Sequence, residues 1–177
     1  MPEILEYLKR GYITPEELFE IIPKPSEERL RARPVAIPEC PQEIPCAPPC
    51  REVCPTGAIS MLTPNDIPIV DYEKCVGCSL CVQICPPGLA FFMVHYVGDK
   101  ARITMPPHEL LPVPKRGDEV VLLNRVGEPV GKGGKVTLII PREKSMGDTA
   151  VVTVEVPIEL AWEVRAIRVP GGGDDDD

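Results

Sequence analysis

The sequence predicts an α+β protein in which a short helical arm precedes a pseudo-symmetric cysteine-rich domain, followed by a small antiparallel β-rich module with a terminal helix. Three observations support this prediction. Helix-capping residues stand before position 35, all cysteines fall between positions 40 and 85, and β-branched runs separated by glycine and proline dominate after position 110. We therefore expect a helical arm, a cysteine-rich domain, a β-rich module and a disordered tail over 1–34, 35–110, 111–169 and 170–177.

The arm contains one well-marked helix. Thr14 stands before Pro15 and three residues before Glu17, and apolar residues follow at helical spacing. A threonine N-cap, a proline at the first helical position and a glutamate at the third are typical of a helix start, so a helix is predicted up to Ile22, where prolines end it. A second helical turn is expected over 26–31. The arm is either an ordinary packing element or a dedicated docking hook.

The cysteines of this chain are confined to one quarter of it, which needs a local cause. The eight are Cys40, Cys46, Cys50, Cys54, Cys75, Cys78, Cys81 and Cys85. Three causes are available: a disulfide framework, zinc, or iron–sulfur clusters. Disulfides suit oxidising compartments and very small domains, whereas this chain starts without a signal-peptide pattern and continues for more than 90 residues beyond its last cysteine. Structural zinc usually takes two Cys-x2-Cys pairs a dozen or more residues apart, which leaves three consecutive knuckle cysteines unexplained.

The second cysteine group has the spacing of a cluster-binding loop. Residues 75–86 follow the run C-x2-C-x2-C-x3-C-P, which in bacterial ferredoxins binds [4Fe-4S] clusters. Two-residue gaps let a tight loop wrap three corners of an iron–sulfur cube, and Gly77 allows the backbone to approach closely. The fourth cysteine, Cys85, points away from this loop and ligates the other cluster in two-cluster proteins.

The first group repeats the second with an offset. Cys50 and Cys54 stand 31 residues before Cys81 and Cys85, although the spacing upstream of Cys50 is looser. Such a repeat predicts a pseudo-symmetric fold in which each half gives three ligands to one cluster and one ligand to the other. One cluster is expected to bind Cys40, Cys46, Cys50 and Cys85, and the other Cys54, Cys75, Cys78 and Cys81.

Residues 35–97 resemble a 2[4Fe-4S] ferredoxin domain. Residues 39–46, which read Glu-Cys-Pro-Gln-Glu-Ile-Pro-Cys, are similar to one branch: the ferredoxin-like subunits that accompany FAD-dependent amine or imino-acid dehydrogenases of the proline, hydroxyproline and hydrogen-cyanide-synthase type. The similarity extends more weakly over 111–169. Between Cys46 and Cys50 the chain has three residues where that family usually has two. The resemblance implies an FAD-containing dehydrogenase subunit as electron donor, alone or with further redox subunits.

The β-rich module is predicted from three runs separated by turn signals at Gly127 and Gly147. Upstream of it, 89–97 and 101–105 are expected to pair as a hairpin across Gly98. The three runs, which fit a small antiparallel sheet or a partial barrel, are 119–123, 135–140 and 150–156.

Two further segments of the module carry predictions. Pro157 and the helically spaced apolar residues behind it predict a closing helix over 157–167. The glycine-rich stretch 131–135 lacks the G-x4-G-K-[ST] spacing of a phosphate loop, so we expect a β-turn there. Trp162 is expected to pack on the closing helix or to anchor an interface.

Composition excludes several function classes. The net charge is −8, or −4 without the four aspartates that end a glycine-rich tail resembling a linker or expression scar, and no long basic run is present. Nucleic acid is therefore not an expected partner. The chain has neither a run of 18 apolar residues nor a signal-peptide pattern, so we expect no membrane span and a cytoplasmic location. Scarce asparagine and glutamine indicate a thermophilic source.

Three functions follow from these observations, in order of preference. The first is a non-catalytic electron-transfer subunit with two [4Fe-4S] clusters, because no catalytic set is legible and about half the chain lies after residue 97. The second is a free soluble ferredoxin that carries electrons by diffusion, which the size of the native particle would distinguish. The third is a zinc-binding structural protein, which would be colourless.

Overall fold

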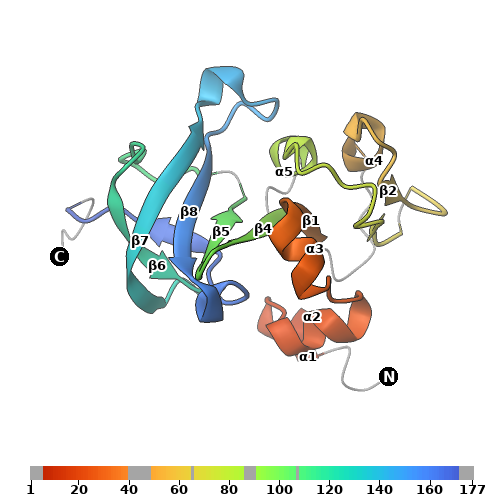
Figure 1. The fold of residues 1–177 in the computed structure, drawn as a ribbon, viewed down its shortest axis with the longest axis horizontal. Helices are drawn as coiled ribbons and strands as arrows, with labels where there is room; N and C mark the ends of the chain where they lie inside the picture. The colour runs from red at the N-terminus through yellow and green to blue at the C-terminus, as the bar shows by residue number, and fades with distance from the viewer. Residues whose placement is uncertain (1–5, 40–48, 65, 86–90, 107, 172–177) are drawn as a thin grey trace.

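The computed structural model of the chain describes residues 6–39, 49–64, 66–85, 91–106 and 108–171. Within these residues, strands that lie far apart in the sequence join into one seven-stranded antiparallel sheet (Figure 1). Across the sheet its strands are β1 (Val35–Pro38), β4 (Phe91–Val97), β5 (Lys100–Thr104), β8 (Val151–Pro157), β7 (Pro129–Ile140), β6 (Glu119–Leu123) and β9 (Ala166–Arg168). A separate antiparallel pair consists of β2 (Ile59–Ser60) and β3 (Ile69–Val70). None of the helices in these ranges combines the length and the apolar composition that a membrane span requires.

In the described residues before β1, the chain forms three short helices. They are α1 (Glu6–Arg10), α2 (Pro15–Ile21) and α3 (Glu27–Ala32). At the start of α2, Glu17 N donates a hydrogen bond to the Thr14 hydroxyl at 3.3 Å, and Thr14 N donates one to the Glu17 carboxylate at 2.8 Å. Ser26 caps α3 by accepting a hydrogen bond from Arg29 N at 3.1 Å. Both helical segments predicted for the arm are confirmed.

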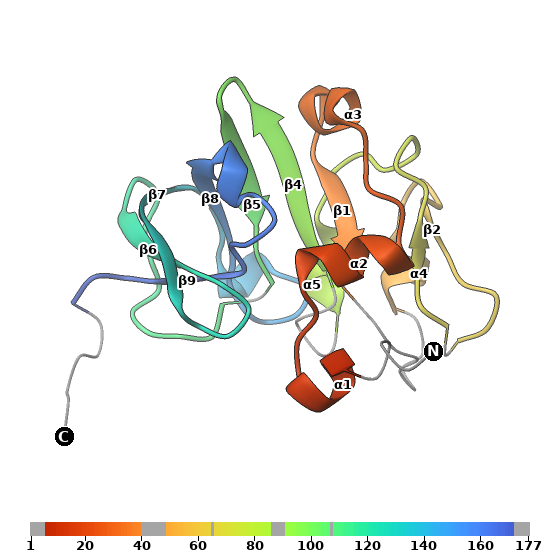
Figure 2. The ribbon, with the colours of Figure 1, turned by 90° about the horizontal axis from the view of Figure 1, so that it is seen from below.

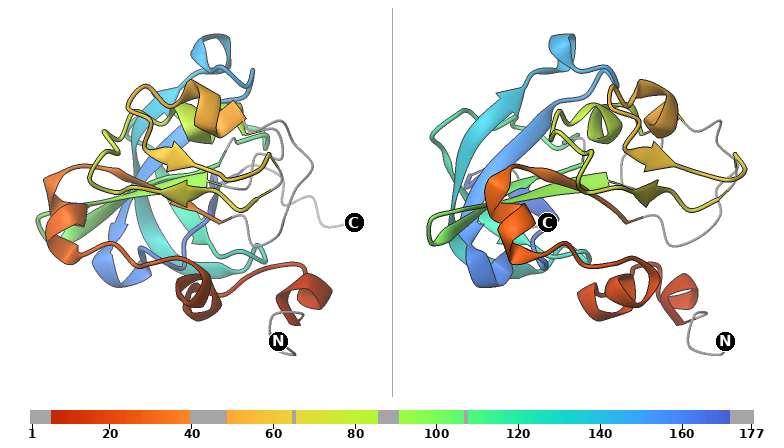
Figure 3. Two further views of the ribbon diagram at one scale, coloured as in Figure 1. Left: turned by 90° about the vertical axis from the view of Figure 1, so that its right-hand side faces the viewer. Right: turned by 45° about the vertical axis from the view of Figure 1, so that its right-hand side comes forward.

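Strands β1 and β4 separate two apolar cores, because successive side chains of a strand point to opposite faces. Phe92 and Val94 of β4 face one core, which also contains Leu18 of α2. Phe91 and Met93 face the second core, which contains the buried cysteines. Figure 3 shows this arrangement, with α2 and α3 on one side of β1 and β4 and the cysteine-rich segment on the other. One strand pair therefore supports both halves of the molecule.

The sheet continues without a break from the cysteine-rich region into the C-terminal region. Strands β4 and β5 form the predicted hairpin, in which Val97 lies opposite Lys100. Strand β5 then pairs with β8, and Ile103 lies opposite Val154. Figure 2 shows the sheet curling so that β6, β7 and β9 turn away from the plane of β4. A β-rich region after residue 110 is confirmed, and its strands share one sheet with β1 and β4.

The predicted terminal helix over 157–167 is wrong. The chain there makes a single 3-10 turn, η3 (Ile158–Leu160), and then extends into β9. The apolar residues that suggested a helix, such as Val164 and Ile167, are fully buried. They reach the core because Arg165 N donates to Leu123 O at 2.9 Å and β9 pairs with β6. Pairing satisfies the backbone edge of β6, which a helix would leave open.

The β-turn predicted over 131–135 is also wrong, since these residues lie inside β7. Gly133 adopts a left-handed φ of 86°, and the pairing of β7 with β6 shifts register between Val120 and Leu122. A Cβ on Gly134 would lie 2.3 Å from Leu122 Cδ2. Glycine is therefore needed for a bulge and for close packing, as is common for glycine inside strands.

Trp162 joins the arm to the sheet. Its ring packs edge-to-face against Phe19, with ring centroids 4.8 Å apart, and against Phe92 at 6.2 Å. Its Nε1 donates a hydrogen bond to the Tyr96 hydroxyl at 3.1 Å. Because the expected closing helix is absent, Trp162 packs between α2 and β4.

Candidate metal centre

Two short helices carry the second halves of the two cysteine groups. They are α4 (Pro49–Val53) and α5 (Leu80–Ile84), which pack against each other (Figure 1). Helix α4 contains Cys50 and is followed by Cys54, whereas α5 contains Cys81 and is followed by Cys85. The cysteines that repeat with the 31-residue offset thus occupy the same positions on the two helices.

Four of the predicted ligands line one cavity. They are Cys54, Cys75, Cys78 and Cys81. Cys54 comes from the first cysteine group and the other three come from the second, which is the crossed combination expected from the sequence. The rest of the lining is mostly apolar and includes Ala36, Ile59, Val70 and Met93. All four cysteines are free thiols, and among the described residues no group of three or more potential ligands is arranged around a single-ion position.

The other predicted ligand set is only partly within the described residues. Cys50 and Cys85 are buried in the same core, which also contains Phe91 and Val82. Neither lines the cavity formed by the other four cysteines. Cys40 and Cys46 lie outside the described residues, so this set remains a prediction.

The loop that carries Cys75 and Cys78 has an unusual backbone. Gly77 adopts a φ of 76°, and a Cβ at this position would lie 2.8 Å from Pro34 O. Ser79 also has a left-handed φ, 62°, immediately before α5. Such conformations are costly for residues other than glycine and persist where the surroundings enforce them. Glycine is thus required at position 77 because Pro34 lies against it, whereas the close approach of this loop to a cluster stays a prediction.

Backbone N–H groups point at two of the sulfur atoms. Ala58 N donates to Cys54 Sγ at 3.2 Å, and Ala36 N donates to Cys75 Sγ at 3.5 Å. Hydrogen bonds of this kind stabilise a thiolate and tune the potential of a cluster bound to it. The four thiols, their N–H donors and the apolar lining fit an iron–sulfur cluster, whose thiolate ligands must be deprotonated and whose potential depends on the hydrogen bonds and apolar groups around it.

The thiols of this cavity differ in acidity. Burial acts to raise the pKa of Cys54, but hydrogen bonds from the Thr56 hydroxyl and from backbone N–H groups outweigh it, so the pKa is lowered. Burial raises the pKa of Cys81 strongly, and the neighbouring Cys75 and Cys78 add to this effect. Cys54 is therefore deprotonated more readily than Cys81 when a metal binds.

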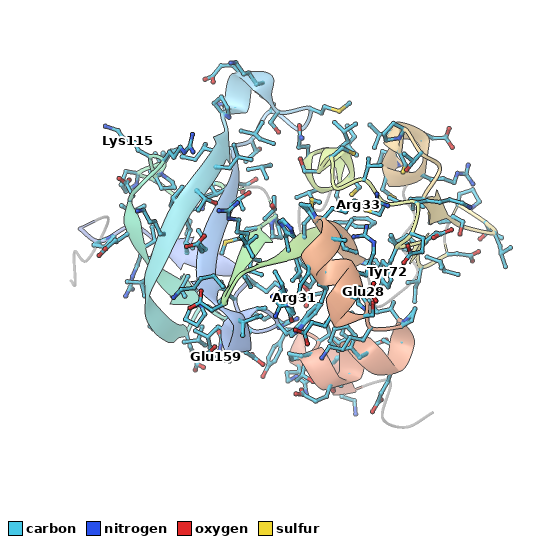
Figure 4. All side chains as sticks on the ribbon, in the orientation of Figure 1. Glu28, Arg31, Arg33, Tyr72, Lys115 and Glu159 are labelled. Atoms are coloured by element: carbon cyan, nitrogen blue, oxygen red, sulfur yellow. The ribbon has the colours of Figure 1, made fainter. Side chains whose placement is uncertain are left out.

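Two arginines of the arm hold the loop that leads into Cys75. Arg29 is buried and donates to Tyr72 O at 2.6 Å, to Arg33 O at 3.0 Å and to Cys75 O at 2.7 Å. Arg33 donates to Cys75 O at 2.9 Å and to Glu73 O at 2.6 Å. Figure 4 shows Arg33 and Tyr72 where α3 meets the cysteine-rich segment. No sequence pattern indicates this role, because arginines in and directly after a short helix are typical of an exposed basic face.

A second buried network contacts the residue before Cys40. The Glu39 carboxylate accepts hydrogen bonds from Arg125 Nε and from Arg165 Nε, the latter at 2.8 Å, and less than a tenth of each side chain is exposed. The Arg165 guanidinium lies 3.4 Å from the Phe92 ring centroid. Burial lowers the pKa of Arg165 to about 10, which leaves it charged at neutral pH. The Nη2 atoms of both arginines are buried without a hydrogen-bond partner among the described residues. Nothing in the local sequence signalled this contact, since its members are far apart in the chain.

Comparisons with known proteins agree with this centre. Residues 44–89 match the family model of the 4Fe-4S dicluster domain. The match indicates two [4Fe-4S] clusters in this part of the chain. No solved structure matches the chain.

Curated relatives match only part of this chain. A sulfite dehydrogenase subunit of Allochromatium vinosum is 51% identical over 41 residues, which cover 23% of this chain and 17% of the relative. An uncharacterized ferredoxin of Methanocaldococcus jannaschii is 38% identical over 64 residues, covering 36% of this chain and 40% of the relative. The thiosulfate reductase electron transfer subunit of Salmonella typhi is 42% identical over 55 residues, covering 31% of this chain and 26% of the relative. The chain thus spans less than half of each of these relatives.

Proposed function

We propose that this chain is an electron-transfer subunit that relays electrons through two [4Fe-4S] clusters for a larger oxidoreductase. When bound, such clusters take up and release one electron at a time. In this proposal Cys54, Cys75, Cys78 and Cys81 bind one cluster. The other cluster is bound by Cys40, Cys46, Cys50 and Cys85.

One observation carries the proposal. Cys54 lines the same cavity as Cys75, Cys78 and Cys81, although 20 residues separate it from the nearest of them in the sequence. A ligand exchanged between the two motifs is the arrangement of two-cluster ferredoxins. The packing of α4 against α5 supports the same exchange for Cys85.

The residues around the cavity have two tasks. Ala58 N and Ala36 N supply hydrogen bonds to sulfur, and the apolar lining excludes water, so both set the electrostatic environment of the bound cluster. Arg29 and Arg33 fix the carbonyl of Cys75 and so position that ligand. In this proposal, none of these groups reacts with a substrate.

The relatives support a subunit role in this chain. Several of them are named as subunits of sulfite dehydrogenase, selenate reductase and thiosulfate reductase. The finer proposal, from the resemblance of residues 39–46, is an FAD-dependent amino- or imino-acid dehydrogenase as partner. In that complex the β-rich region 111–169 would serve as the docking module, because it folds without any cysteine of its own.

Iron and sulfide analysis after anaerobic purification tests the first step. We expect about eight iron and eight sulfide per chain, whereas a colourless zinc protein would refute the proposal.

The crossed arrangement is tested by Cys54→Ala and Cys85→Ala with electron paramagnetic resonance of each cluster. Cys54→Ala should damage the cluster of Cys75, Cys78 and Cys81, and Cys85→Ala should damage the other one. If each substitution damaged only the cluster bound by the other cysteines of its own sequence group, the proposed ligand exchange would be wrong.

The partner is tested separately by the size of the native particle and by proteins that co-purify with it. A stable complex with a flavoprotein supports the subunit role. A monomer that still holds two clusters would favour a free ferredoxin, the second candidate, which the similarity to the Methanocaldococcus jannaschii ferredoxin supports.

A further inference from the structure

A wide groove lies beside the cavity of Cys54, Cys75, Cys78 and Cys81. Its volume is about 670 Å³, and its lining comes from β4, β5, β7 and β8 and from the loop before α5. Gly77 and Ser79 form part of the loop wall, and Arg116 and Gly117 come from the segment before β6. The groove is thus built from both the cysteine-rich and the C-terminal parts of the chain.

The charge of the groove is opposite to that of the protein. Its lining contains three basic residues, Arg102, Arg116 and Lys135, and no aspartate or glutamate, while the whole chain has a net charge of −8. Arg102 is partly neutralised by Glu155, which lies 3.3 Å away. Arg116 and Lys135 are exposed and form no ion pair with another described residue, although Glu119 of β6 and Glu155 of β8 lie opposite Lys135 in the sheet.

The lining of the groove includes three threonines that the sheet holds in place. Thr104 and Thr153, which are opposite each other on β5 and β8, have hydroxyl oxygens 2.9 Å apart. Thr137 Oγ1 donates to Thr153 O at 3.2 Å. His95 also lines the groove, and burial together with Arg102 lowers its pKa, which keeps it neutral at pH 7. The three basic side chains therefore supply the positive charge.

The groove and the cysteine cavity share a thin wall. Ser79 and Met93 line both of them. Cys78, which is the most exposed of the described cysteines, stands between the two groove-lining residues Gly77 and Ser79. A molecule bound in the groove would be separated from a cluster in the cavity by a single layer of residues.

We propose that this groove is the port through which the cluster of Cys54, Cys75, Cys78 and Cys81 exchanges electrons with an acidic segment of a redox partner protein. This inference rests on the proposed function. A cationic groove on an acidic protein attracts carboxylates, raises the rate of encounter with them and repels wrong partners. Because Arg116 and Lys135 are exposed, they attract a carboxylate before contact. After contact, the Thr104–Thr153 hydroxyl pair has one proton left to donate to it.

A pair of oppositely charged oxidants tests the port on the intact, cluster-loaded protein. Ferricyanide is an anion and hexaammineruthenium(III) is a cation. Each takes one electron from the reduced protein, becoming ferrocyanide or hexaammineruthenium(II), while the iron–sulfur centre loses that electron. The test variant combines Arg116→Glu with Lys135→Gln. The matched control, Lys100→Gln with Lys144→Glu, changes the net charge equally at exposed positions outside the groove.

We expect the groove variant to lose about tenfold of its ferricyanide rate at low salt and to react faster with hexaammineruthenium(III). The difference in oxidation rate between the groove variant and the control should shrink at about 1 M salt, where the Debye length is about 3 Å. Calorimetry with a hexaglutamate peptide gives a readout without electron transfer. If the peptide binds to the wild type and to the control but not to the groove variant, the result supports the port.

Equal rates and equal peptide binding in the two double variants, with both clusters present, would overturn the port and leave the proposed function intact. The reverse failure is also distinguishable, because a protein without clusters refutes the proposed function before any rate is measured. Binding of inorganic phosphate in preference to the peptide would refute the acidic protein partner.

Discussion

Removing the Arg29 side chain should loosen the loop that carries Cys75 before the rest of the protein unfolds. Replacing it by methionine keeps an apolar stem of similar length but removes three hydrogen bonds to carbonyl oxygens. The Cys75 carbonyl retains Arg33 Nε at 2.9 Å, so two carbonyls lose their Arg29 donor. A hydrogen bond from a charged group contributes about 1.5–3 kcal/mol, which gives roughly 3–6 kcal/mol for two. Burial of the Arg29 charge lowers its pKa and offsets part of this, so we expect a loss of about 2–4 kcal/mol.

Urea unfolding followed by circular dichroism measures the total loss, and visible absorbance measures retention of clusters in the same samples. Arg31→Met is the matched control, because Arg31 lies on the same helix but is exposed, pairs with Glu27 and donates one hydrogen bond to Gly98 O at 2.8 Å. The surface pair contributes about 0.3–0.5 kcal/mol and the hydrogen bond about 0.5–1.5 kcal/mol, so we expect the control to lose about 1–2 kcal/mol. We expect Arg29→Met to lose absorbance before the circular dichroism signal falls, since the arginine holds the Cys75 loop directly. A loss under about 1 kcal/mol with unchanged absorbance would refute this role of Arg29.

Three further predictions concern the cysteine-rich region. Gly77→Ala should destabilise the protein more than Gly57→Ala, because both positions have a positive φ but only the first has backbone within 3 Å of the new Cβ; equal unfolding midpoints would contradict this. Glu39→Gln should cost about 3–5 kcal/mol in urea unfolding, because it leaves its two buried arginines without a counter-charge, and a loss below about 1 kcal/mol would mean that water reaches them. In cluster-free protein, site-resolved alkylation should reach half its maximal rate at lower pH for Cys54 than for Cys81, because hydrogen bonds lower the first pKa and burial raises the second; the opposite order would refute the assignment.

Local signals predicted the elements whose causes are local. The capping residues Thr14 and Ser26 marked α2 and α3, and alternating apolar residues marked the β4–β5 hairpin. The two-residue gaps predicted one loop for Cys75, Cys78 and Cys81, and the crossed repeat predicted Cys54 beside them. The four thiols do line one cavity, whereas their binding of a cluster stays a prediction.

The sequence could not predict features that depend on distant partners. Residues 157–167 have a helical apolar pattern, yet the open edge of β6 captures the end of this segment as a strand. The contact of Glu39 with Arg165 joins residues 126 positions apart. Nor did any pattern indicate the groove, whose charged residues come from β5, β7 and a loop and become neighbours only when the sheet forms.

Because β5 pairs with β8, the sheet cannot be completed until β8 has been synthesised. Strand β8 begins 47 residues after β5 ends. At roughly 5–20 residues per second, a ribosome needs about 2–10 s to make that interval. During this time β5 has an open edge, and such an edge can pair with other chains. The cysteines are synthesised before β8, so cluster insertion can begin while the edge of β5 is still open. Slower translation lengthens the time in which that edge can pair with other chains.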